Sequence, residues 1–194
     1  MLDALTLRRL YEDKRKSVQE IADIFGCSPH KISYWIKKYN ILTRSHSEAT
    51  YAKRNPHGDP FSFRLPVSTK EGQLFGLGLG LYWGEGNKAN KNSIRLGNTD
   101  PAIIRSFIQF LFIFFNIKMM DLKFGLQIFS DIDPELALDF WVKQLNILRS
   151  QINKPVVTRS GAVGTYRKKN QTGVLTVMYH NKKARDLLIS LLPL

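Results

Sequence analysis

The chain has 194 residues, 43% of them hydrophobic and 11% aromatic, so it has enough apolar material for packed cores and is not globally disordered. Its 29 Lys and Arg residues against 16 Asp and Glu residues give a net charge of +13, which is typical of proteins that bind a polyanion. One cysteine, Cys27, excludes a disulfide within the chain and a cysteine-rich zinc site. No apolar run is long enough to cross a bilayer, and we expect a cytoplasmic, nucleoid-associated protein.

Two helices with strong capping signals are predicted near the N-terminus, at Ser17–Gly26 and Pro29–Tyr39. The first has the capping-box pattern of a serine followed three residues later by Glu20. The second begins with Ser28 as N-cap and a proline at the first helical position. With an earlier helix, this pattern predicts a helix-turn-helix DNA-binding domain over residues 1–42. A small helical hairpin with a solvated basic face is the alternative.

The second of these helices supplies the side chains that we expect to contact DNA. Its apolar residues share one face, which leaves the polar and basic residues outward. The outward residues near its N-terminus are predicted to enter the major groove, and they are His30, Lys31, Ser33 and Tyr34. The later pair, Lys37 and Lys38, is better placed for phosphates.

Residues 43–70 are predicted to be a basic linker. They include serines and the turn-forming run Asn55–Pro60. Their basic side chains are suited to an arm that follows the DNA backbone or minor groove, and a plain tether fits the same composition.

The segment Gly78–Gly86, which reads GLGLYWGEG, ends an apolar run. Gly76, Gly80 and Gly84 recur every four residues and therefore share one stripe of a helix. A glycine costs about 1 kcal/mol in a helix interior, and such a stripe permits a second helix to approach closely. The carboxylate of Glu85 follows the stripe, so two packed copies would bring two carboxylates together, as in metal-dependent phosphodiester cleavage.

At these residues the chain resembles the LAGLIDADG homing endonucleases. Gly80, Leu81, Glu85 and Gly86 match the family's glycine, leucine, acidic residue and closing glycine. Trp83 stands where an aspartate is usual. The resemblance implies that Glu85 binds Mg²⁺ or another divalent cation. A buried glycine-rich helix with no chemistry is the alternative.

Seven further elements are predicted after the motif, in the order strand, helix, strand, helix, strand, strand, helix. Their expected positions are 92–97, 101–115, 122–130, 134–146, 154–159, 173–180 and 181–192. The whole chain is therefore expected to be α+β. Residues 71–194 are expected to form a LAGLIDADG-like endonuclease domain, with helices packed on one face of an antiparallel sheet that binds DNA. The family's core repeats helix, strand, strand, from which this order departs.

The segment between Phe140 and Arg185 has ten Lys or Arg residues and no Asp or Glu, and it is predicted to face phosphates. The DNA-binding residues expected after the linker are Arg95, Arg159, Arg167, Lys168 and Lys169. Catalysis would also need a residue that positions water or offsets charge beside Glu85, and the candidates are Lys123, Gln127 and Lys154.

These features together predict a site-specific double-stranded DNA endonuclease of the homing type, linked to intron or intein mobility. A single motif supplies one carboxylate, so the active form is expected to be a homodimer through Gly76, Gly80 and Gly84 with Mg²⁺ at the motif carboxylates. The first alternative is a non-cleaving transcriptional regulator that pairs a helix-turn-helix with a LAGLIDADG-like domain, which the departure at Trp83 favours. An RNA-splicing helper is the second alternative.

Overall fold

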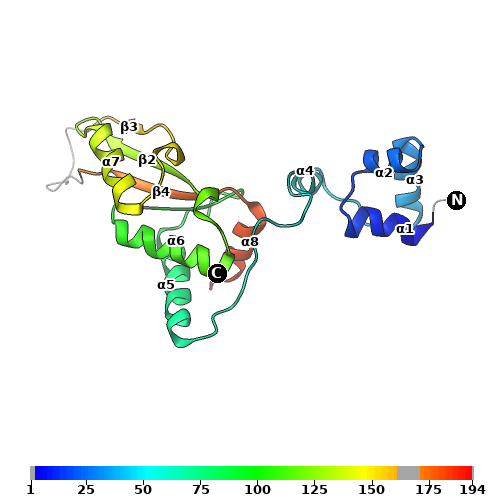
Figure 1. Ribbon diagram of the computed structural model, residues 1–194, viewed down its shortest axis with the longest axis horizontal. Coiled ribbons are helices and arrows are strands. Elements are labelled where there is room, and N and C mark those ends of the chain that lie inside the picture. The colour runs from blue at the N-terminus through cyan, green and yellow to red at the C-terminus, as the bar shows by residue number, and fades with distance from the viewer. Residues whose placement is uncertain (1–2, 161–170, 194) are drawn as a thin grey trace. The chain divides into compact units, whose positions relative to one another are not determined.

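A computed structural model describes residues 3–160 and 171–193 of the chain (Figure 1). The predicted DNA contacts Arg167, Lys168 and Lys169 lie outside these residues. The chain divides into two compact units, Met1–Pro60 and Phe61–Leu194. The segment predicted to be a linker is therefore shared between the two units.

The first unit is helical around its own apolar core. Its helices are α1 (Ala4–Arg8), a short π-helical turn (Arg9–Asp13), α2 (Val18–Ile24), α3 (Pro29–Lys38) and α4 (His46–Arg54). The predicted capping box of Ser17 and Glu20 is confirmed, and Ser28 caps α3. Gly26, between α2 and α3, has a φ of 58°, a left-handed conformation that other residues rarely adopt.

Helix α4 lies inside the predicted linker. It begins with a second capping box, in which the Ser45 side chain and the Glu48 carboxylate each accept a hydrogen bond from the other's backbone N–H. At the other end of the predicted linker, Phe61 and Phe63 pack against the core of the second unit. The linker prediction was therefore wrong for both of these stretches, because local capping and aromatic contacts order them.

The second unit has the predicted order of elements, and the general α+β class is confirmed. The elements are α5 (Thr69–Glu85), β1 (Ile94–Asn98), α6 (Pro101–Phe115), β2 (Lys123–Phe129), α7 (Pro134–Leu145), β3 (Val156–Thr158), β4 (Val174–Tyr179) and α8 (Lys182–Ser190). Asp100 and Asp133 cap α6 and α7, each before a proline in the first turn.

The four strands form one mixed sheet in the order β1-β4-β2-β3. Strand β4 pairs antiparallel with both β1 and β2, whereas β3 pairs parallel with β2. The prediction of an antiparallel sheet was therefore wrong. The reason is the crossover through α7, which brings the chain back to the same end of the sheet before β3 begins.

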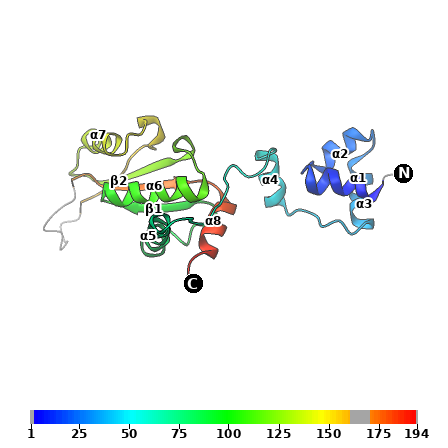
Figure 2. The ribbon, with the colours of Figure 1, turned by 60° about the horizontal axis from the view of Figure 1, so that its bottom comes forward.

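The core of the second unit lies on one face of this sheet, against the helices (Figure 2). Along β2, Phe124, Leu126 and Ile128 are buried in that core, whereas Lys123 and Gln127 on the opposite face are exposed. The alternation of β2 thus separates a buried apolar face from a face that is open to solvent and carries Lys123, Gln127 and Phe129.

Candidate functional site

Helix α5 packs on α6 through a glycine outside the predicted stripe. A Cβ atom added to Gly78 would lie 2.2 Å from ring atoms of Phe110, so only glycine permits this approach. One turn later, the fully buried ring of Tyr82 stacks on Phe107 with 5.8 Å between the ring centroids. Burial raises the pKa of Tyr82, and the charge of Arg185 opposes that shift.

The predicted glycine stripe lies on the open face of α5. A Cβ atom added to Gly76, Gly80 or Gly84 would meet no described atom within 4 Å. Between these glycines, Leu77 is 48% exposed and Trp83 is 52% exposed. We call this surface the α5 open face. Within the chain no described residue packs on it, although it is apolar and closely approachable.

Glu85 is the last residue of α5 and is exposed. Its carboxylate makes no hydrogen bond or ion pair with any residue in the described ranges, so it is free to bind a ligand. Within those ranges no three His, Cys, Asp or Glu side chains gather into a metal site. A divalent cation at Glu85 would therefore need further ligands, such as phosphates, water or a second copy.

The end of α5 is joined directly to the edge of the sheet. Gly86 forms a β-bridge with Leu96 of β1, and the Asn87 N–H donates to the Arg95 carbonyl at 2.9 Å. A Cβ atom at Gly86 would lie 2.3 Å from the Tyr82 carbonyl oxygen, so the closing glycine of the motif is needed for space. Glu85 is thereby held beside β1.

Arg95 is held on the open side of the sheet near this edge. Its Nε donates to Ser93 Oγ at 2.9 Å, and Ser93 Oγ donates in turn to the Asn90 side chain at 3.0 Å. A second ionisable group, His180, follows β4. Loss of hydration and then the positive charge of Arg95 lower the pKa of His180, which favours its neutral form.

The three predicted catalytic partners of Glu85 are spread across the sheet. Lys123 shares a row with Arg95, because both pair with Met178 of β4. Gln127 lies four residues further along β2 and donates to Thr158 Oγ1 at 3.3 Å. Lys154 is exposed just before β3, at the edge opposite β1. Of the three, Lys123 is thus the one on the row nearest Glu85.

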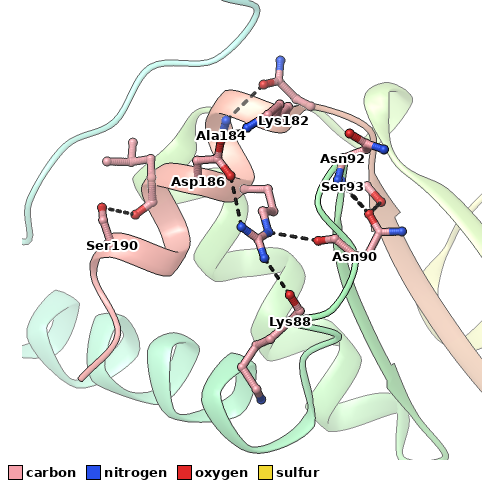
Figure 3. A network of polar contacts seen from close by, with 11 residues as sticks. Lys88, Asn90, Asn92, Ser93, Lys182, Ala184, Asp186 and Ser190 are labelled. Atoms are coloured by element: carbon pink, nitrogen blue, oxygen red, sulfur yellow. Dashed lines mark hydrogen bonds and ion pairs between the residues drawn. The ribbon is translucent and has the colours of Figure 1, made fainter. Parts of the chain in front are cut away.

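Lys88, three residues beyond the end of α5, is a charged group near Glu85 that the sequence did not indicate. Lys88 Nζ donates to the carbonyl oxygens of Trp83 at 2.6 Å and of Gly86 at 3.2 Å. Arg185 of α8 holds the same loop, because its guanidinium donates to the carbonyls of Lys88 and Asn90 (Figure 3). No local pattern indicated this, since Arg185 and Lys88 are 97 residues apart.

The acid-free basic segment is only partly available to phosphates. Arg149 pairs with Glu135 and Asp139 of α7, and Arg185 is engaged in the contacts just described. The expectation that the whole segment faces phosphates was therefore wrong for Arg185, whose side chain is 14% exposed, whereas Arg149 is 48% exposed beside its acidic partners. Arg159, directly after β3, is exposed.

In the first unit, all six predicted DNA contacts are exposed on α3. They are His30, Lys31, Ser33, Tyr34, Lys37 and Lys38. The ammonium of Lys38 lies 4.6 Å from the ring centroid of Trp35, a cation–π contact that orders its side chain. In contrast, Arg44 is unavailable as an arm, because it lies 4.2 Å from the ring centroid of Tyr11 and donates to the Arg15 carbonyl.

None of the helices in the described part of the chain has the length and apolar character that spanning a membrane requires. Comparisons with protein-family models, curated proteins and solved structures found no match to this chain.

Proposed function

We propose that this chain is a site-specific double-stranded DNA endonuclease of the LAGLIDADG homing type that acts as a homodimer. The observation that carries the proposal is the α5 open face, which ends at the exposed carboxylate of Glu85. This glycine-rich surface is covered by none of the described residues and ends at an acid without a described partner, so it is suited to pairing with a second copy.

In such a dimer, two α5 helices pack parallel about a twofold axis, with Gly76, Gly80 and Gly84 at the contact. Equivalent ends then meet, so the two Glu85 carboxylates come together next to the edges of both sheets. Leu77 and Trp83 lose their exposed apolar surface, which favours association. The twofold axis predicts a near-palindromic DNA target.

Glu85 fits the role of a Mg²⁺ ligand, because its carboxylate is exposed and has no partner among the described residues. When bound, Mg²⁺ would supply an activated water and stabilise charge on the phosphate. The chain's own residues would place the DNA. Arg95 and Lys123 on the open side of the sheet are suited to phosphates, and the exposed residues of α3 are suited to base edges and phosphates.

A non-cleaving transcriptional regulator is the second candidate. The observation that favours it is Trp83, whose bulky side chain is 52% exposed on the α5 open face two residues before the carboxylate. At this position an indole adds contact area but no metal ligand, so each chain would bring Glu85 and no other acid of the motif to the contact, and the same dimer would bind DNA without cutting it.

The test uses duplexes selected for binding from a random-sequence pool and then incubated with Mg²⁺ or Mn²⁺. We expect the wild type to cut them and the Glu85→Gln variant to bind them with equal or higher affinity but leave them intact. The control is Glu12→Gln, which should cut normally. It removes an exposed carboxylate from the π-helical turn that follows α1 in the first unit.

Three outcomes are informative. Wild-type protein that binds tightly and never cuts would favour the regulator. Cleavage by Glu85→Gln at the wild-type rate would exclude a mechanism based on this carboxylate. Absence of duplex binding would refute both candidates.

A further inference from the structure

The C-terminal end of α5 presents a fixed positive charge within one turn of Glu85. Lys88 is half-buried, and its ammonium bonds the carbonyls of Trp83 and Gly86, which flank Glu85 in the chain. The carbonyl groups at a helix C-terminus carry partial negative charge, so they attract an ammonium placed there and hold it in position. The carboxylate and the ammonium are thus presented at the same helix end.

The ammonium of Lys88 has bonding capacity left. A lysine side chain has three N–H donors, and the two carbonyls of α5 account for two of them. The third donor has no acceptor among the described residues. A strong acceptor such as a phosphate oxygen would complete the set.

The backbone of Lys88 is held in place from the other side by Arg185. The guanidinium Nη2 donates to the Lys88 carbonyl at 2.6 Å, and Nε donates to the Asn90 carbonyl at 3.0 Å. Asp186 accepts from Nη1 at 3.0 Å, and the Arg185 side chain is only 14% exposed. The Lys88 carbonyl oxygen thus accepts a hydrogen bond from Arg185, and Figure 3 shows that the Lys88 side chain extends away from that oxygen.

We propose that Lys88 contacts a DNA phosphate next to Glu85 and that Arg185 is the positioning residue that holds it there. The proposal rests on the proposed function, because DNA must approach the end of α5. The Glu85 carboxylate repels the phosphates of the DNA. An ordered cation beside it offsets that repulsion and also offsets any negative charge that develops on the phosphate during cleavage. Lys123 is less suited to this role, because it lies two strands from β1, roughly 10 Å away by ordinary strand spacing.

The first measurement is the salt dependence of duplex binding without added divalent cation. Each phosphate contact contributes a slope of about −0.9 to the logarithm of the binding constant against the logarithm of salt concentration. We expect Lys88→Met to lose about one such contact. Lys91→Met is the matched control, because Lys91 is exposed on the same loop with no partner in the described ranges, and its slope should stay near that of the wild type.

Two further variants separate contact from folding. Lys88→Arg keeps the charge and should keep the wild-type slope. Arg185→Lys also keeps its charge but cannot donate to the Lys88 and Asn90 carbonyls together. Its salt dependence should therefore be as shallow as that of Lys88→Met. Thermal unfolding of each variant identifies any that fail to fold. The binding slopes are compared only among variants that unfold at the wild-type temperature.

The outcomes distinguish this inference from the proposed function. If duplexes are cut, Lys88→Met should also slow cleavage by roughly a hundredfold to a thousandfold at saturating protein. If they are bound but not cut, the slope still decides. A folded Lys88→Met variant with the wild-type slope would overturn the inference while DNA binding stands, and a wild type that binds no duplex would overturn both.

Discussion

Replacing Gly80 by alanine is expected to stabilise the second unit, whereas the same replacement at Gly78 is expected to be neutral or destabilising. Both residues lie in the interior of α5, so each substitution gains about 1 kcal/mol of helix propensity. Gly80→Ala adds a methyl group to open space, whereas Gly78→Ala places one 2.2 Å from the ring of Phe110. The common propensity gain cancels, and the difference between the two variants reports the contact alone.

The contact is expected to cost about 1–3 kcal/mol, the usual range for overpacking. Phe110 has little room to move, because it is fully buried and its ring lies within 6 Å of the rings of Phe75, Phe107, Phe114 and Phe115. For a unit of this size about 1 kcal/mol corresponds to roughly 4 °C, so the two transition temperatures should differ by roughly 4–12 °C.

Differential scanning calorimetry of the full chain measures this difference. The transition that shifts from its wild-type temperature in these variants belongs to the second unit. Several protein concentrations are needed, because Gly80 lies on the face proposed for pairing. Equal transition temperatures for Gly78→Ala and Gly80→Ala would refute the reasoning, since they would mean that α6 moves aside without cost.

Three further predictions concern association, pH and the division of the chain. Gly80→Leu should leave the second unit folded but prevent the proposed dimerisation, so that the variant sediments as a monomer, and a variant dimer as stable as that of the wild type would exclude pairing through this face. The hydrogen bond from Arg64 lowers the pKa of Glu71 to about 2 from 4.5, so the stability that ionised Glu71 contributes above pH 4.5 should disappear as the pH falls towards 2. In urea titrations, Glu71→Gln should lose less unfolding free energy over that pH interval than the wild type. An identical loss in both proteins would contradict the assignment. The fragment Phe61–Leu194 should unfold cooperatively by itself, and a broad, probe-dependent transition in circular dichroism would show that it needs the first unit.

Local signals in the sequence predicted most of the elements, because they act over a few residues. Serine or aspartate caps with a proline or glutamate in the first turn placed the starts of α2, α3, α6 and α7. The same signal was present at Ser45 and Glu48 but was outweighed by the turn residues nearby, and α4 was missed.

Pairings between distant parts of the chain were not predictable in this way. Whether β3 runs parallel or antiparallel depends on the path of the chain through α7, which no strand pattern records. Three stripe glycines were visible in the sequence, but only the position of Phe110 makes Gly78 the one that contacts a neighbour. The hydrogen bond from Arg185 to the Lys88 carbonyl likewise joins α8 to the loop after α5, two segments that are far apart in the sequence.

The order of strands in the sheet has a consequence for synthesis on the ribosome. Strand β4 is the last to be made, yet it lies between β1 and β2, which do not pair with each other. Until residues 174–179 have emerged, the earlier strands lack their hydrogen-bonding neighbour, and the apolar helix α6 has no finished sheet to cover. A nascent or prematurely terminated chain would therefore carry the complete Gly78–Gly86 motif on an unfinished, aggregation-prone support.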